Sequence, residues 1–189
     1  MRRDIIRRFI FLFVACTVIL SGTMVFAKQK QEPPPNVQAR IGTLYLFQKT
    51  AAEGPWPVVQ GGAWGDLTYN LFGDKFNFMF KGRQLNPGTD YTLIYYPDPW
   101  PGTNLICLGA GVANKGGNLS IFNFDFDIGT SLPAKYDANY SPVSPSGAVG
   151  AKIWLVLSSD VNCADRYMTG WTPDEYLFEY NLINFELLQ

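Results

Sequence analysis

Four of the five tryptophans stand in segments rich in glycine, proline and threonine rather than in alternating apolar runs. A rigid indole beside an aspartate or asparagine suits sugar binding, because its flat face stacks on C–H groups while polar neighbours take hydroxyls. The simpler interpretation is that these rings cover the core at the open ends of a β-sandwich, and on that interpretation Trp100 is buried. The segments are GPWPVV around Trp56, GGAWGD around Trp64, DPWPG around Trp100 and TGWTPD around Trp171, and the candidate ligand-binding residues are Trp100, Asp98, Trp64 and Trp171.

Acidic and amide side chains on alternate residues form a second candidate site. Their oxygens can converge on Ca²⁺, which takes about six to eight oxygen ligands. The same residue types favour turns by bonding to their own backbone, which explains the pattern without a metal. Asp137 and Asn139 are the best candidates for calcium ligands, since KYDANYSP has few other means of ordering itself, and we expect no other cofactor. The remaining pairs are Asp125 with Asp127 and Asp160 with Asn162.

The chain contains no histidine. This excludes Ser-His-Asp and Cys-His catalysis, imidazole bases and histidine zinc sites. Hydrolysis by a carboxylate pair stays open as an alternative, because glycosidases use two carboxyls roughly 5–10 Å apart. The candidate acids are Asp98, Asp160, Asp174 and Glu175, but the last two serve a helix start more simply, with Thr172 as its cap. We therefore expect a protein that is not an enzyme.

Residues 1–27 have the layout of a secretory signal peptide, with a basic start, an apolar stretch and the small Ala27 at the cleavage edge. An uncleaved anchor is the alternative, because Phe9 to Ala27 gives 19 mostly apolar residues and about 20 span a bilayer. Residues 28–40 carry a triple proline, which favours an extended flexible linker. We expect a single β-sandwich domain over residues 41–189, secreted or held in the cell envelope, with no membrane span once the signal is removed.

Export changes the charge and the cysteine count of the chain. Without residues 1–27 it has 11 basic and 15 acidic residues, a net charge near −4, and no basic stripe, so we expect no nucleic-acid partner. Two cysteines remain, Cys107 and Cys163, and an oxidising compartment predicts a disulfide between them. The loop of about 57 residues that it closes would stabilise the fold by roughly 4 kcal/mol. A buried pair of free thiols is the alternative.

From Ile41 onward, apolar residues recur at period two, and glycine, proline and asparagine punctuate them. Phe76, Phe78 and Phe80 share one face of a strand, as a sheet with one buried face requires, and Trp154 is expected in the core. About eight strands in this length predict an all-β fold, an antiparallel two-sheet β-sandwich of immunoglobulin-like or related Greek-key type. The expected strands cover residues 41–47, 67–72, 75–81, 91–96, 105–111, 119–126, 152–158 and 176–188.

One local motif resembles a known family. The segment LNPGTDYTLIYY, Leu85 to Tyr96, is similar in its spacing Leu-x-Pro-Gly-Thr-x-Tyr to the tyrosine corner of fibronectin type III and immunoglobulin-like domains. The resemblance implies that Tyr91 is the corner tyrosine, whose hydroxyl bonds to the chain a few residues upstream. The cysteine spacing and the longer loops depart from those families. As a whole, the chain looks like exported β-sandwich domains of prokaryotic surface proteins.

These features together predict an exported, non-catalytic module at the cell surface or in the envelope. Its expected partner is a glycan, or another surface protein to which it adheres. A structural subunit of a surface or matrix assembly is one alternative, and a carboxylate-dependent hydrolase is another.

Overall fold

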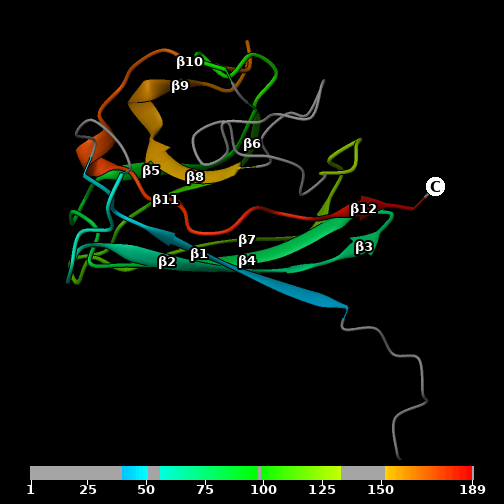
Figure 1. Ribbon diagram of the computed structural model, residues 1–189, viewed down its shortest axis with the longest axis horizontal. Coiled ribbons are helices and arrows are strands. Elements are labelled where there is room, and N and C mark those ends of the chain that lie inside the picture. The colour runs from blue at the N-terminus through cyan, green and yellow to red at the C-terminus, as the bar shows by residue number, and fades with distance from the viewer. Residues whose placement is uncertain (1–39, 51–55, 98, 133–151, 189) are drawn as a thin grey trace, which may run out of the picture. The chain divides into compact units, whose positions relative to one another are not determined.

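Two antiparallel sheets face each other across a hydrophobic core (Figure 1). The structure is a computed structural model that describes residues 40–50, 56–97, 99–132 and 152–188, all within one compact unit of residues 36–189. The five-stranded sheet has the order β11-β1-β2-β4-β7, and the three-stranded sheet has the order β6-β5-β8. The strands are β1 (Ile41–Phe47), β2 (Trp64–Asn70), β4 (Phe76–Arg83), β5 (Asp90–Tyr96), β6 (Ile106–Val112), β7 (Leu119–Phe126), β8 (Lys152–Leu157) and β11 (Phe178–Glu179).

Short elements complete the described part of the chain. The strand β12 pairs in parallel with β3, β9 and β10 form a small antiparallel pair, and two 3₁₀ turns, η1 and η2, are present. This confirms the all-β sandwich, although the described residues form twelve strands where about eight were expected, because five of them have only two residues. The predicted signal peptide and linker fall on residues 1–39, outside the described residues. The bounds are β3 (Phe72–Gly73), β9 (Val161–Asn162), β10 (Tyr167–Met168), β12 (Glu186–Leu187), η1 (Ser158–Asp160) and η2 (Pro173–Glu175).

Period-two alternation builds the core between the sheets. In β4, the side chains of Phe76, Phe78 and Phe80 all point inward and are buried. The Phe76 ring lies 5.4 Å from the Phe78 ring and meets Phe185 edge-on at 5.0 Å, where aromatic pairs are favourable. Burying each such ring stabilises the fold by about 1.5–3 kcal/mol. The alternation in the sequence therefore predicted correctly which face of this strand is buried.

The strand β11 joins the two sheets along one edge. It pairs with β1, where Leu46 faces Glu179. One residue before β11 begins, Leu177 forms a bridge with Leu155 of β8 through two backbone hydrogen bonds of 2.9 Å. The inner and outer faces of the five-stranded sheet therefore continue into those of the three-stranded sheet.

Buried charges lie at this junction. Glu179 accepts a hydrogen bond from the Trp154 indole, and its carboxylate lies 3.9 Å from the Lys49 ammonium group, which also donates to the Glu179 carbonyl at 2.6 Å. Lys152 is fully buried, with its ammonium nitrogen 5.6 Å from the centre of the Trp154 ring. Buried charges need partners of this kind, because desolvation otherwise costs more than the fold can offset.

The three-stranded sheet is covered on both faces. All six residues from Tyr91 to Tyr96 are buried, and so are the first five residues of β8. The inner face packs in the core between the sheets, and a second cluster with Trp154, Tyr176 and Phe178 covers the outer face. Residues 158–178 provide this outer layer, which lies over β5 and β8 in Figure 1. Trp154 is thus buried, as expected, but in the outer cluster.

A disulfide between Cys107 and Cys163, with an S–S distance of 1.95 Å, ties this outer segment to β6 and confirms the predicted pairing. Arg166 adds a second attachment. Its guanidinium group donates to the carbonyls of Leu105 and Asn104, and its own carbonyl accepts from the Asn104 backbone amide at 3.0 Å. The outer segment is therefore fixed to the turn between β5 and β6 by covalent and polar contacts.

The Tyr91 hydroxyl accepts a hydrogen bond from the backbone amide of Asn86, five residues upstream, at 3.3 Å. Tyr91 itself is 1% exposed, and Gly88 takes the left-handed conformation, with φ of 79°, in the turn between the two residues. The bond therefore ties the turn that precedes β5 to a core side chain.

One local expectation is wrong. Residues 176–188 do not form one long strand, because this segment pairs first with β8 and β1 and then crosses to pair through β12 with β3. The expected helix start is present as the short 3₁₀ turn η2, with Thr172 at its N-cap position and Pro173 at its start, but the Thr172 side chain makes no capping bond.

Candidate aromatic binding site

Aromatic rings from four separate segments meet over the outer face of the three-stranded sheet. Trp171 lies at the centre, with its ring 5.4 Å from Trp100, 5.7 Å from Trp56, 5.6 Å from Tyr176 and 6.0 Å from Trp154. Tyr176 and Trp154 are buried and Trp56 is partly buried, whereas Trp100 is 51% exposed and Trp171 is 42% exposed. The cluster therefore has a packed base and two indoles open to solvent.

The expectation that Trp100 is buried is wrong. The Pro99–Gly102 turn packs against the outer cluster through Gly102, which lies against the Tyr96 ring, while the Trp100 ring itself meets Trp171 edge-on and stays half-exposed. Trp171 acts partly as the expected cover, because one side of its ring packs on buried Tyr176 while the ring stays partly exposed.

The loop that carries Trp171 is anchored on Asp160. The backbone amides of Thr169 and Gly170 donate to the Asp160 carbonyl at 2.9 Å and 3.2 Å. On the other side of the indole, the Thr172 amide donates to the Tyr176 hydroxyl at 3.0 Å, and that hydroxyl donates to the Asp160 carboxylate. Both flanks of Trp171 are thus held by bonds that end on the same buried aspartate.

The Trp100 turn is also held in place. Gly102 donates to the Pro99 carbonyl at 2.8 Å and closes the turn, and the Trp100–Pro101 peptide bond is cis. The Met168 amide of β10 donates to the Pro101 carbonyl at 2.9 Å. Because proline has few backbone conformations to lose, a turn of this composition presents its indole at low entropic cost.

The Tyr176 hydroxyl, which bonds the anchor Asp160, has a raised pKa. Burial raises the pKa of the Tyr176 hydroxyl, and the hydrogen bond to the Asp160 carboxylate raises that pKa further. Tyr176 therefore stays protonated and continues to donate to Asp160 beyond the pH at which an ordinary tyrosine ionises.

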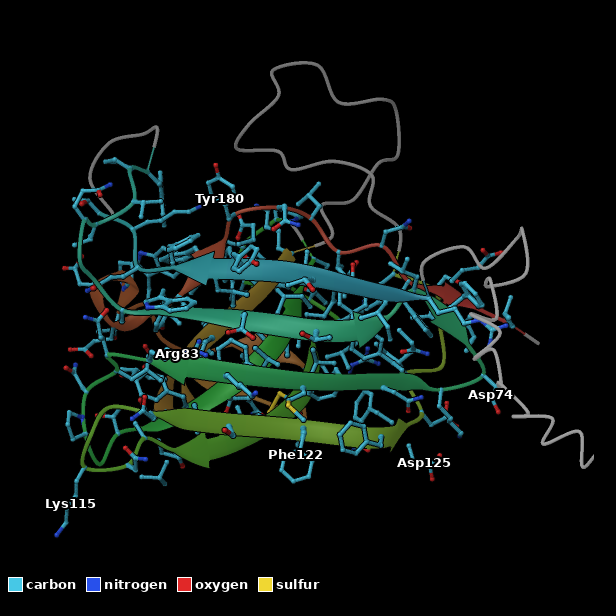
Figure 2. The ribbon with its side chains drawn as sticks, turned by 90° about the horizontal axis from the view of Figure 1, so that it is seen from below. Asp74, Arg83, Lys115, Phe122, Asp125 and Tyr180 are labelled. Atoms are coloured by element: carbon cyan, nitrogen blue, oxygen red, sulfur yellow. A yellow bond between two sulfur atoms is a disulfide. The ribbon has the colours of Figure 1, made fainter. Side chains whose placement is uncertain are left out.

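The structure brings together only part of the predicted set of ligand-binding residues. Trp64 is not a loop residue but the first residue of β2, and its ring lies under the Arg83 guanidinium group at 4.3 Å. Arg83 in turn bonds Asp66 at 2.6 Å on the outer face of the five-stranded sheet (Figure 2). Asp98 lies outside the described residues. Trp56, which the sequence marked only as an aromatic loop residue, joins the cluster instead, at 5.0 Å from Phe178.

The calcium candidates Asp137 and Asn139 lie outside the described residues. Among the residues that are described, no group of three or more histidine, cysteine, aspartate or glutamate side chains is arranged to hold a metal. Of the other acidic pairs, Asp127 bonds Lys75 at 3.0 Å, and the Asp160 carboxylate is bonded to Tyr176. These contacts give Asp127 and Asp160 structural partners.

The three described carboxylates among the candidates for hydrolysis lie in two different settings. Asp160 is buried beneath the Trp171 loop. Asp174 and Glu175 are neighbours in η2, beside a hollow of only about 50 Å³, and the Glu175 carboxylate accepts a bond from the Asn86 side chain. This hollow holds about one or two water molecules, which is too little for a sugar ring.

Sequence reasoning missed a second aromatic feature. Tyr45 and Tyr180 line a shallow hollow of about 480 Å³ together with Phe47, Val58 and Gln60. Tyr180 was assigned to a long strand, and Tyr45 was one alternating residue in another. An exposed aromatic at the end of a strand gives no signal in a period-two pattern, so only the pairing of β11 with β1 could reveal the hollow.

Comparison of the chain with protein-family models, curated proteins and solved structures finds no match. Within the ranges that the structure describes, no helix is long and apolar enough to cross a bilayer.

Proposed function

We propose that the protein is an exported, non-catalytic module that binds a glycan on the face formed by Trp100 and Trp171. The observation that carries this proposal is the edge contact of two half-exposed indoles, each on a turn anchored to β10 or to Asp160. Exposing two tryptophans is unfavourable unless a ligand covers them, because each ring presents a large apolar surface to water. Anchored turns lose little entropy on binding, which favours this use of the site.

Export is supported by the secretory pattern of residues 1–27 and by the Cys107–Cys163 disulfide. Disulfides persist in oxidising compartments such as the periplasm or the cell exterior. We therefore place the protein outside the cytoplasm, secreted or held in the envelope.

A binding role without catalysis is supported by the state of the described acids. Asp160 serves the anchor of the Trp171 loop, and Glu175 is bonded to Asn86 beside a hollow too small for a sugar. The absence of histidine leaves a carboxylate pair as the main alternative for hydrolysis. Turnover of any substrate in a panel of glycosides, lost in Asp98→Asn, would replace this proposal with an enzyme.

A glycan array probed with the purified full-chain protein tests the proposal. We expect hits whose signal falls at least about five-fold in Trp100→Ala and Trp171→Ala, since a stacked aromatic contributes about 1 kcal/mol or more. Trp64→Phe is the matched control, because Trp64 packs under Arg83 on another sheet and its replacement keeps an aromatic ring. An array without hits, or hits unchanged in both cluster variants, would overturn the proposal.

A second candidate function, a structural subunit of an assembly, is favoured by one observation. Phe122 and Phe124 on the edge strand β7 are each 61% exposed, and their rings stack at 5.7 Å. Exposed apolar edge strands are sites of pairing between chains. Light scattering across a concentration series tests this candidate. We expect self-association that Phe122→Lys abolishes, whereas a monodisperse monomer at high concentration would contradict it.

A further inference from the structure

The hollow around Tyr45 and Tyr180 has the residues of a sugar subsite. Tyr45 is 45% exposed and Tyr180 is 68% exposed, and the Tyr180 ring meets Phe47 edge-on at 5.6 Å. Gln60 adds an amide, so the lining combines flat apolar faces with hydroxyl and amide groups. Its volume of about 480 Å³ lies within the range of small-molecule sites.

Hydrogen bonds to the backbone fix the positions of the two tyrosines that line this hollow. The Tyr180 amide donates to the Tyr45 carbonyl at 2.8 Å, continuing the β11–β1 pairing by one residue. The Asn181 side chain then accepts from the Tyr45 amide at 3.2 Å. Both tyrosines therefore sit on paired backbone.

One segment of the chain contributes residues to both the hollow and the tryptophan cluster. Residues 56–60 run as an extended segment that pairs with 48–50, through the Thr50 amide to Pro57 and the Val59 amide to Gln48. Alternate residues of an extended segment share a face. Trp56 therefore enters the cluster, 5.7 Å from Trp171, while Val58 and Gln60 line the hollow.

A second connection runs through the sheet itself. Phe178, 5.0 Å from Trp56, is paired in register with Phe47, which lines the hollow. Aromatic residues thus lead from Trp100 through the cluster to Phe178, and across the β11–β1 register pair from Phe178 to Phe47, whose ring meets Tyr180.

The chemistry of this surface indicates an uncharged ligand. None of the five lining residues of the hollow is charged. The nearest charge along the sheet row, Asp66 opposite Tyr45, is already paired with Arg83 at 2.6 Å. A row of aromatic faces with neutral hydrogen-bonding groups suits a chain of pyranose rings whose equatorial links leave C–H groups on both flat faces.

We propose that the Tyr45–Tyr180 hollow is a second subsite of the same binding face, and that the ligand is a neutral, linear, β-1,4-linked polysaccharide lying across both subsites. This inference rests on the proposed glycan function and specifies its ligand class. The tryptophan end binds one part of the polymer, and the tyrosine hollow binds a unit further along it.

Isothermal titration with cello- and chito-oligosaccharides of two to six units tests the inference. A short oligosaccharide reaches one subsite and a long one reaches both, so we expect the hexamer to bind at least about ten-fold tighter than the dimer in one of the two series. Tyr180→Ala should reduce the hexamer affinity to that of the dimer and leave dimer binding unchanged. Trp171→Ala should weaken both.

Two further variants make the test specific. Tyr180→Phe keeps the ring and should retain most of the length dependence. Phe122→Ala removes a similarly exposed aromatic on β7, at the opposite edge of the sheet face from Tyr180 (Figure 2), and should leave the dimer and hexamer affinities unchanged. Because both side chains are exposed, unchanged thermal unfolding will show that the variants fold.

Different results would overturn this inference and the proposed glycan-binding function. Equal affinity for dimer and hexamer, or length dependence that survives Tyr180→Ala, overturns the second subsite while leaving glycan binding intact. Array hits confined to charged or branched glycans overturn the ligand class. An array without any hit overturns the proposed function and this inference together.

Discussion

Tyr176→Phe should destabilise the protein strongly although it removes one oxygen atom. The hydroxyl donates to the buried Asp160 carboxylate and accepts from the Thr172 amide at 3.0 Å. A hydrogen bond to a charged group contributes about 1.5–3 kcal/mol, and the substitution leaves Asp160 buried with a poorer set of partners. The ring keeps its packing in the outer cluster, so we expect the free energy of unfolding to fall by about 2–3 kcal/mol.

Urea unfolding at pH 7 measures this change. Tyr180→Phe is the matched control, because its hydroxyl belongs to a residue that is 68% exposed, and we expect a change below about 0.5 kcal/mol. A double-mutant cycle with Asp160→Asn should show coupling of about 1 kcal/mol or more between the two positions. A Tyr176→Phe loss no larger than that of the control would refute the assignment of Asp160 as the buried anchor.

The same hydroxyl predicts a pH dependence. Because the pKa of Tyr176 is raised in the fold, its contribution to stability is complete below about pH 10, the pKa of tyrosine in an unfolded chain. Above that pH the unfolded chain loses the proton while the folded state retains it, so stability falls as the pH rises. Burial raises the pKa of Tyr91 and Tyr69 as well. Tyr176→Phe should therefore reduce, but not abolish, the alkaline loss of stability, and an unchanged slope would contradict this reasoning.

Three further predictions concern the scaffold. The Cys107→Ser/Cys163→Ser double variant should lose roughly 4 kcal/mol of unfolding free energy in urea, because the disulfide closes a loop with a sequence separation of 56 residues. Intact-mass analysis after alkylation should find no free thiol in the unmodified protein. Gly102→Ala should cost more than about 2 kcal/mol of unfolding free energy, because alanine is strained at a φ of 71° and its Cβ would lie 2.3 Å from the Tyr96 ring. The control Gly61→Ala, at a φ of 70° with open space around it, should cost only about 1 kcal/mol. Equal costs would contradict the packing of the Trp100 turn. Tyr91→Phe should cost about 1 kcal/mol in the same assay, less than Tyr176→Phe, because its hydroxyl accepts from the neutral Asn86 amide rather than donating to a buried carboxylate.

The fold was predictable where one face of a strand is buried. The expected bounds 41–47 and 119–126 agree with β1 and β7, and the phenylalanines of β4 lie on the predicted face. Local alternation sufficed in these strands, since the core covers one side and water the other.

Prediction failed where distant segments determine the structure. The sequence of β5 gives no sign that both its faces are covered, because the cover comes from residues 158–178 and is attached through Arg166 and Cys163. The segment 176–188 carries apolar residues typical of a strand, yet its pairing partners change along its length. Which strands pair with one another depends on tertiary contacts, and the strand propensities of the residues do not determine it.

The candidate site was only half visible in the sequence. Glycine and proline neighbours marked Trp100 and Trp171 as unusual, and these two indoles do lie together. The same signal wrongly grouped Trp64 with them, because a glycine before a strand resembles a loop. The tyrosine hollow depends on cross-strand register between segments more than 130 residues apart, and no local pattern reports such a register.

Indole resonances in a ¹⁵N–¹H correlation spectrum test the central claim most directly. The five tryptophans give five indole signals, which single substitutions assign. On titration with the strongest glycan from the array, we expect shifts for the indoles of Trp100 and Trp171, while the signals of Trp64, under Arg83, and Trp154, bonded to Glu179, stay in place. Shifts confined to Trp64, or an unchanged spectrum at saturating glycan, would contradict it.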